Sequence, residues 1–211
     1  MKVEIWSDVV CPWCYIGKRR FEAGLGRFEH AGEVEVVWKS FELDPDAAAR
    51  RGPTLAHLAR KYGVSEEQAA QMHERMEAAA AAEGLEYHLD ETQGGNTFDA
   101  HRLIHLAAAH GVQDEMKERL LRAYFTEREP VGDREVLARL GEEVGLADAA
   151  EVLASDAYAD AVRSDEREAR LLGIGAVPFF VVDRYYGIEG AQPAEVILRA
   201  LDEAWAAKAA A

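Results

Sequence analysis

Apolar and polar residues alternate near the start of the chain in the way that is typical of β-strands. Residues 2–6 (KVEIW) and 34–41 (VEVVWKSF) each predict a strand. Between them apolar residues recur at helical spacing, and Pro12 suits a first helical turn, where a missing N–H costs nothing. A right-handed crossover through this helix would make the two strands parallel.

The period changes to 3.6 from about residue 54 and stays there to about residue 173, which predicts a long all-helical block. Ser65, followed three residues later by Gln68, predicts a capping box at the start of one of its helices.

Strand character returns at residues 179–183 (FFVVD), and residues 185–190 (YYGIEG) offer a short partner across a turn. Pro193 then begins a final helix with one apolar face. The order is therefore βαβ, helical block, ββα, which predicts an α/β fold whose two outer pieces share one sheet. We expect the pieces to be residues 1–50 and 174–211, and the insertion to be residues 51–173.

Composition and charge limit the partners that this chain can have. The 211 residues are 49% hydrophobic, enough to bury a sizeable core without a disulfide or a structural metal. Lys and Arg number 24 against 39 Asp and Glu, so the formal charge of -15 would repel nucleic acid and anionic lipid in the absence of a basic patch, and none is evident. No apolar run resembles a signal peptide or a transmembrane span, which predicts a cytoplasmic protein.

The chain has only two cysteines, Cys11 and Cys14, and they form a C-x-x-C motif. A cysteine at a helix start is exposed to unpaired N–H groups and to the positive end of the helix dipole, which favour thiolate over thiol. We therefore expect Cys11 to be partly exposed, with a lowered pKa. Cys14, one turn further along, could form a disulfide with Cys11 and so release a substrate from a mixed disulfide.

Two other interpretations of the cysteine pair are open. A zinc site needs about four ligands, and the second C-x-x-C that would complete one is absent, so we expect no metal. Tyr15 follows Cys14 where haem attachment requires His. The two thiols could also be buried side by side without any redox role.

Three segments together resemble a known family: a strand leading into CPWC at a helix start, NTFDAHRL at residues 96–103, and GAVPFF at residues 175–180. This combination resembles the thioredoxin-fold DsbA family, specifically its FrnE-like branch, over nearly the whole chain. The resemblance implies that Cys11 attacks a disulfide and Cys14 resolves the intermediate. It also implies a cis peptide bond between Val177 and Pro178, beside the thiols, where a substrate strand would dock.

The chain also departs from its relatives. Periplasmic DsbA enzymes have His inside the motif, whereas this chain has Pro12 and Trp13, so its redox potential is left open. The related 2-hydroxychromene-2-carboxylate isomerases and kappa-class glutathione transferases carry Ser where Cys11 stands, so the retained Cys11 favours disulfide exchange. Trp13 is expected to be exposed and to contact substrate.

Other polar residues near these motifs allow two interpretations each. Asp8 could accept the proton of Cys14 during resolution, or it could cap the loop. His101 and His105 have a spacing that can bind a metal, but a third ligand is lacking, so a packing role is favoured. Asn96 or Thr97 could cap the helix that contains His101, and the resemblance places this segment facing the thiols.

Three functions remain open. The first is a cytosolic thiol–disulfide oxidoreductase without a cofactor, acting on disulfide-containing proteins or on low-molecular-weight thiols such as glutathione. The second is a glutathione-dependent isomerase or transferase, and the third is a redox-sensing or chaperone-like binding module. The sequence does not fix the oligomeric state; a homodimer is one arrangement it allows.

Overall fold

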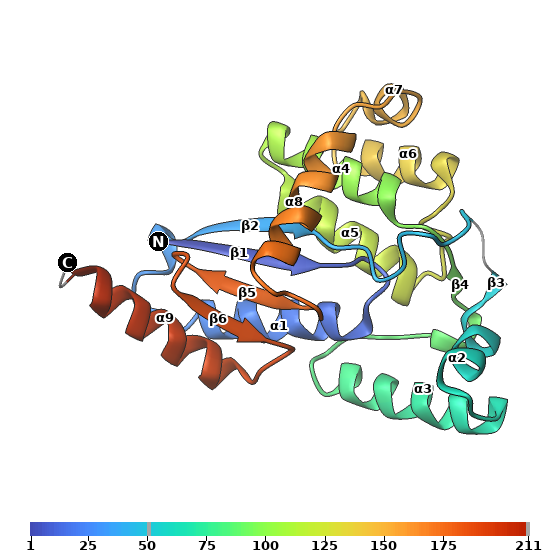
Figure 1. The fold of residues 1–211 in the computed structure, drawn as a ribbon, viewed down its shortest axis with the longest axis horizontal. Helices are drawn as coiled ribbons and strands as arrows, with labels where there is room; N and C mark the ends of the chain where they lie inside the picture. The colour runs from blue at the N-terminus through green and yellow to red at the C-terminus, as the bar shows by residue number, and fades with distance from the viewer. Residues whose placement is uncertain (50–51, 210–211) are drawn as a thin grey trace.

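The computed structural model describes residues 1–49 and 52–209 and centres on a four-stranded mixed sheet (Figure 1). The strand order is β2-β1-β5-β6. Its strands are β1 (Lys2–Ser7), β2 (Glu35–Ser40), β5 (Phe179–Val182) and β6 (Tyr186–Glu189). β1 and β2 are parallel, and the other pairs are antiparallel. This is the thioredoxin fold, and the predicted βαβ and ββα pieces share the sheet as expected.

Helices α1 (Pro12–Leu25) and α9 (Ala194–Ala209) pack against each other on one face of the sheet (Figure 1). In the core beneath them, Phe21 stacks on Phe180 with ring centroids 5.5 Å apart. Val3, Ile5 and Ile16 are fully buried in the same core. Each such side chain contributes roughly 1.5–3 kcal/mol through burial, so this layer fixes α1, and the cysteines at its start, against the sheet.

Between β2 and β5 the chain forms two groups of helices. The first consists of α2 (Thr54–Tyr62) and α3 (Glu66–Ala81). The second consists of α4 (Phe98–His110), α5 (Gln113–Phe125), α6 (Arg134–Glu143), α7 (Ala149–Leu153) and α8 (Ala159–Leu171). Figure 1 shows both groups beside the end of the sheet at which β1 leads into α1.

The edge of β2 is covered by the helical insertion. The Gln113 side chain accepts a hydrogen bond from the Trp38 backbone N–H and donates one to the Trp38 carbonyl, each at 3.0 Å. These bonds satisfy backbone groups that an edge strand leaves unpaired. They also set the position of α5 relative to the end of β1.

The predicted elements differ from the observed ones mainly at their ends. The Ser65–Gln68 capping box is present at the start of α3. A two-residue ladder, β3 (Gly52–Pro53) with β4 (Gln93–Gly94), and the 3₁₀ turn η2 (Leu89–Glu91) interrupt the block that was expected to be all-helical. A second 3₁₀ turn, η1 (Ala31–Glu33), lies before β2. Segments this short carry no measurable periodicity. The predicted division between residues 50 and 51 lies outside the described residues.

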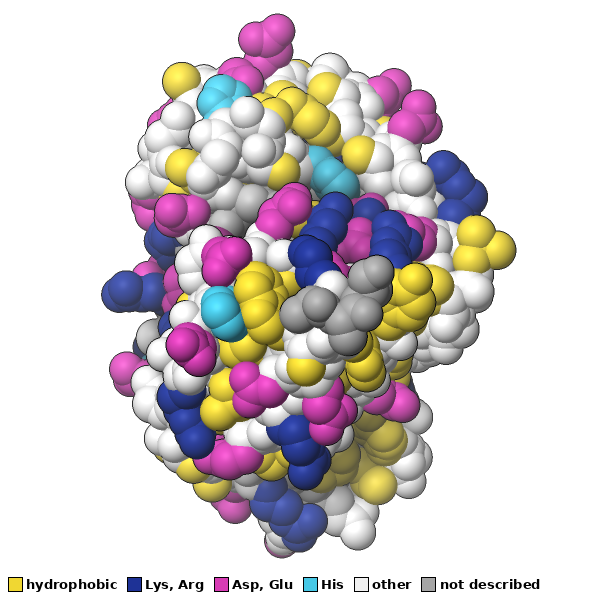
Figure 2. All heavy atoms as spheres, turned by 90° about the vertical axis from the view of Figure 1, so that its left-hand side faces the viewer, with side chains coloured by type: hydrophobic (Ala, Val, Ile, Leu, Met, Phe, Trp, Pro, Cys, Tyr) yellow, Lys and Arg dark blue, Asp and Glu magenta, His cyan; other side chains and the backbone are white. Residues whose placement is uncertain are grey.

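Over the part of the chain that the structure describes, no helix is both long enough and apolar enough to cross a membrane. Figure 2 shows the face that carries the end of α9, where Lys and Arg side chains alternate with Asp and Glu. That face presents no continuous basic surface for a nucleic acid.

Candidate functional site

The two cysteines lie where β1 gives way to α1. Cys11 is the N-cap of α1, Pro12 occupies its first position, and the Cys14 backbone N–H donates to the Cys11 carbonyl at 3.0 Å. Both thiols are buried, with Cys11 only 4% exposed. The expectation that Cys11 is partly exposed is therefore wrong: Cys11 and Cys14 lie inside a small apolar cluster. The other buried members of this cluster are Trp6, Ala169, Ile174, Val177 and Val181.

The loop before β5 lies directly against Cys11. The Cys11 thiol donates to the Val177 carbonyl, with 3.5 Å between Sγ and oxygen, and the Val177–Pro178 peptide bond is cis, as predicted. Gly17 on α1 lets Pro178 approach, because a Cβ at Gly17 would lie 2.8 Å from Pro178 Cγ. The structure thus brings Cys11, Cys14, Val177 and Pro178 together.

The two thiols affect each other's ionisation. The hydrogen bond with Cys14, followed by burial, raises the pKa of Cys11. Burial opposes ionisation of Cys14 too, but the hydrogen bond from Cys11 and the positive charge of Lys117 outweigh it and lower the pKa of Cys14. The expected lowering at Cys11 is therefore wrong, because the apolar surroundings and the adjacent sulfur outweigh the helix start. The surroundings therefore favour ionisation of Cys14 over that of Cys11.

Lys117, on α5, is a site residue that the sequence analysis missed. Its side chain is buried, its Nζ donates to the Ser7 carbonyl at 3.3 Å, and it lies over the Trp38 ring at 5.5 Å. Among the described residues no carboxylate lies within ion-pair distance of it. Burial lowers the pKa of Lys117 to about 8, although the charges of Cys14 and Asp8 oppose this. An ammonium with this pKa stabilises a nearby thiolate and can also release its proton near neutral pH.

Asp8 is fully buried and organises the loop before Cys11. Its carboxylate accepts the backbone N–H of Val9 at 2.7 Å and that of Leu43 at 2.8 Å, and it contacts His101 Nε2 at 3.3 Å. Although burial opposes ionisation, His101 and these N–H groups lower the pKa of Asp8. A carboxylate with a lowered pKa is a weak proton acceptor, so the geometry favours the loop-capping interpretation.

The NTFDAHRL segment reaches the site through His101 and Asn96. His101 is buried against Asp8, and its Nδ1 has no hydrogen-bond partner. Asn96 accepts the Phe98 N–H at the start of α4 and donates to the Pro45 carbonyl. His105 instead pairs with Asp165. The described residues contain no cluster of three or more His, Cys, Asp or Glu suited to a metal.

Trp13 and Tyr87 lie at the first turn of α1. Trp13, between the cysteines, is 43% exposed, as expected. Tyr87 follows α3, and its hydroxyl donates to the Pro12 carbonyl at 2.8 Å, a contact that the sequence analysis missed. Tyr87 thereby ties the insertion to the first turn of α1.

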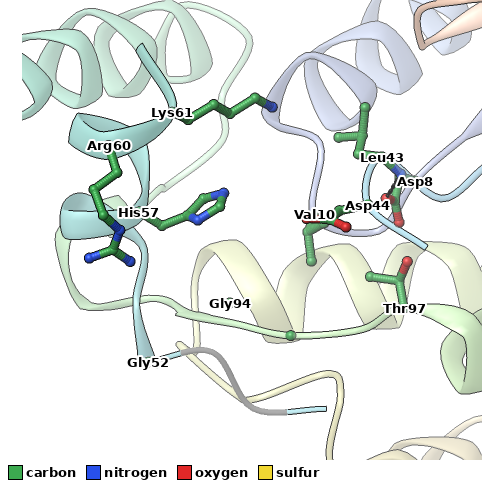
Figure 3. Close-up of a pocket in the computed structure, with 11 residues that line it drawn as sticks. Asp8, Val10, Leu43, Asp44, Gly52, His57, Arg60, Lys61, Gly94 and Thr97 are labelled. Carbon is green, nitrogen blue, oxygen red and sulfur yellow. Dashed lines mark hydrogen bonds between the residues drawn. The ribbon is translucent and has the colours of Figure 1, made fainter. Parts of the chain in front are cut away.

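A cavity of about 520 Å³ adjoins the loop that carries Asp8 and Val10 (Figure 3). Three basic side chains on α2, His57, Arg60 and Lys61, form the wall opposite that loop (Figure 3). The cavity has the size of a small-molecule site.

Comparisons with known proteins agree with this fold. A crystal structure of a probable DsbA oxidoreductase from Streptomyces coelicolor is 50% identical, with a TM-score of 0.94 over 98% of this chain and 90% of that one. The cytosolic disulfide reductase DsbM from Pseudomonas aeruginosa, solved with GSH, is 18% identical, with a TM-score of 0.65 over 96% and 98%. A 2-hydroxychromene-2-carboxylate isomerase is 12% identical, with a TM-score of 0.71 over 99% and 98%.

At these identities the DsbM and isomerase structures support the fold alone. The family model described as DSBA-like thioredoxin domain matches residues 2–202. The chain belongs to the DSBA-like thioredoxin domain family.

Proposed function

We propose that the chain is a cytosolic thiol–disulfide oxidoreductase in which Cys11 attacks a substrate disulfide and Cys14 resolves the intermediate. The observation that carries this proposal is the contact between Cys11 and Val177, with Cys14 one turn deeper in α1. Cys11 thus lies next to the backbone edge where an extended substrate would pair, and Cys14 lies behind it. Trp13 and Pro178 would flank the substrate.

The proton moves within the cysteine pair. In the singly ionised pair Cys14 is the thiolate, so it accepts the proton of Cys11, and the Cys11 sulfur attacks the substrate disulfide. A mixed disulfide forms and the first substrate thiolate leaves, taking the proton from Cys14. The Cys14 thiolate, stabilised by Lys117, then attacks the Cys11 sulfur and expels the second substrate thiolate. Two electrons pass from the enzyme to the substrate, and the reverse sequence oxidises a dithiol.

Each predicted segment of the chain has a separate role in this proposal. Residues 1–50 and 174–211 would form the thioredoxin-like part that holds the cysteines and the docking edge, and the insertion of residues 51–173 would supply Lys117 and the neighbouring cavity. Asp8, Pro12, Asn96 and His101 would support the site without reacting. Substrates would be disulfide-containing proteins or low-molecular-weight thiols and disulfides.

Replacement of Cys14 by Ser tests this proposal. The variant can form the mixed disulfide but has no thiol to resolve it, so substrates should stay attached to Cys11. Intact-mass spectra of the protein recovered from cells should show adducts that disappear on reduction.

The Cys11→Ser, Cys14→Ser double variant is the control and should carry no adduct. An unmodified Cys14→Ser protein after oxidative challenge would refute the proposal. If that variant also kept glutathione-dependent isomerase or transferase activity, the second function would replace the first.

A further inference from the structure

The Ser7 hydroxyl is a buried polar group that has no role in the proton transfers proposed for the cysteines. Ser7 is the last residue of β1 and is 0% exposed, and among the described residues its Oγ has no hydrogen-bond partner. Buried side-chain oxygens nearly always have a partner, so an unpartnered one needs a physical reason. A hydroxyl can rotate to donate to an acceptor that becomes strong at only one stage of a reaction.

The fold places this hydroxyl beside the start of α1. Side chains alternate along β1, so the Ser7 side chain shares a face with Ile5, which lies in the core that α1 covers. Cys14 lies in the first turn of α1. From the other side, Lys117 Nζ donates to the Ser7 carbonyl at 3.3 Å. Ser7 is therefore in contact with the cation that acts on Cys14 and lies on the face where Cys14 is buried.

The Cys14 sulfur is the acceptor for this hydroxyl. Burial opposes ionisation of Cys14, and the hydrogen bond from Cys11 and the charge of Lys117 act against burial. Hydrogen bonds from the Ser7 side chain and from the Asp8 backbone N–H also lower the pKa of Cys14. A thiol sulfur is a weak acceptor, whereas a thiolate accepts charge-assisted hydrogen bonds. The Ser7 hydroxyl thus gains a strong partner only when Cys14 ionises.

The remaining surroundings of the pair do not replace this donor. The Asp8 carboxylate repels negative charge on the cysteines. The Tyr87 hydroxyl is already engaged with the Pro12 carbonyl. The neighbours contributed by α8, the following loop and β5 are the apolar residues Ala169, Ile174, Val177 and Val181.

Building on the proposed function, we propose that Ser7 is a further catalytic residue, whose hydroxyl donates a hydrogen bond to the Cys14 sulfur whenever that sulfur is a thiolate. In the mixed disulfide Cys11 has no proton to donate, so Ser7 and Lys117 hold the charge on Cys14. Cys14 then attacks the Cys11 sulfur, which forms the Cys11–Cys14 bond and expels the substrate thiolate. Both enzyme sulfurs are then neutral and the hydrogen bond from Ser7 is lost. The hydroxyl therefore stabilises the reduced enzyme and not its disulfide.

The Ser7→Ala variant tests this role in a glutathione buffer. Reduced enzyme and oxidised glutathione exchange to give the Cys11–Cys14 disulfide and two molecules of reduced glutathione, and alkylation with mass spectrometry counts both enzyme forms. On the alkaline side of the Cys14 titration, the ratio of disulfide to dithiol should be about tenfold higher in the variant, the effect of losing one hydrogen bond to a charged group. On the acid side Cys14 keeps its proton in both proteins, so the two ratios should agree.

A titration of thiolate absorbance tests the hydrogen bond without any disulfide exchange. In the Cys11→Ser background Cys14 is the remaining cysteine, and adding Ser7→Ala should move its titration to higher pH. A titration that Ser7→Ala leaves in place would refute the role of Ser7 while the proposed function stands. If the unmodified protein formed no Cys11–Cys14 disulfide at any glutathione ratio, the proposed function would fall, and a shifted titration would still support the hydrogen bond.

Ser40→Ala is the matched control. Ser40 lies opposite Ser7 in the register of β1 and β2 and is also buried, but its hydroxyl is bonded to His105 Nε2 at 3.1 Å. Removal of that partnered hydroxyl should lower the free energy of unfolding and leave the ratio of disulfide to dithiol unchanged. Ser7→Ala should keep its stability while both thiols are protonated, because the thiol form loses no hydrogen bond. A Ser7→Ala protein that lost stability as the control does, with an unchanged ratio, would leave Ser7 a structural role and overturn the proposal.

Discussion

Replacing Lys117 by Met separates the role of this side chain in ionisation from a role in packing. Met has a similar length and no charge, so it can fill the buried space on α5. A pKa lowered from 10.5 to about 8 means that the fold disfavours the ammonium by about 3 kcal/mol at 1.36 kcal/mol per pH unit. The Met variant also loses the hydrogen bond to the Ser7 carbonyl, which costs it about 1–2 kcal/mol and offsets part of that gain. We therefore expect Lys117→Met to raise the free energy of unfolding at pH 7 by about 1–2 kcal/mol.

The pH dependence of this gain has a definite sign. Below pH 8, Lys117 is protonated in both the folded and the unfolded states. The unmodified protein then bears the full cost of the buried ammonium, and the stability gained by the Met variant is greatest. Between about 8 and 10.5 the unfolded state binds the proton that the folded state has released, so the unmodified protein becomes more stable relative to the variant. The advantage of Met should therefore shrink across this window. Urea unfolding of the reduced protein at several pH values measures it.

The same replacement should make the thiols harder to ionise, although it makes the fold more stable. Without the Lys117 charge, the pKa of Cys14 should rise, so a titration of thiolate absorbance should show the first ionisation of the cysteine pair at a higher pH. Lys18→Met is the matched control, because Lys18 is equally buried but pairs with Glu22, Asp114 and Glu118. That variant should lose about 1 kcal/mol and leave the thiol titration unchanged. If Lys117→Met lost stability like the control and left the thiol titration unchanged, the reasoning would be refuted.

Two further changes test contacts around the site. Burial and the hydrogen bond with Glu166 raise the pKa of Glu42 to about 7, so the stability that Glu42 contributes is complete below about pH 4.5 and lost as the pH rises through 7. The Glu42→Gln variant should have the same free energy of unfolding as the unmodified protein at pH 4.5, and a free energy ~1–2 kcal/mol higher above pH 7. Unfolding midpoints measure this, and an equal difference at both pH values would contradict it. Gly17→Ala should lower the free energy of unfolding by about 1–3 kcal/mol, because the added methyl group pushes against Pro178. It should also slow mixed-disulfide formation more than Gly32→Ala, a control in which the added methyl group meets no neighbour. Equal losses of stability and rate in the two variants would contradict the contact.

The sequence predicted those features that depend on short stretches of chain. The strand, helix and strand of the first forty residues, the capping box at Ser65 and the closing ββα unit each follow from local periodicity or from one motif. The cis bond before Pro178 followed from the family resemblance. The β3–β4 ladder was missed because its strands have two residues each.

The ionisation of the site could not be predicted in the same way. The helix start at Cys11 gave a local reason for a thiolate, but burial depends on Val177 and Ile174, more than 160 residues away in sequence. Lys117 resembles any other lysine of an amphipathic helix until α5 is packed against the end of β1. Only then does its Nζ lie 3.3 Å from the Ser7 carbonyl, where its charge acts on Cys14.

The helical insertion therefore sets the chemistry of the thiols as well as covering them. The thioredoxin-like part supplies two sulfur atoms and a docking edge, and these alone would leave a buried pair with raised pKa values. Lys117 on α5 offsets this for Cys14. Relatives that keep the cysteines but change the residue at position 117 should differ in thiol pKa, even where the sheet and α1 are unchanged. The insertion is thus a part of the chain through which thiol ionisation can change without altering the reacting atoms.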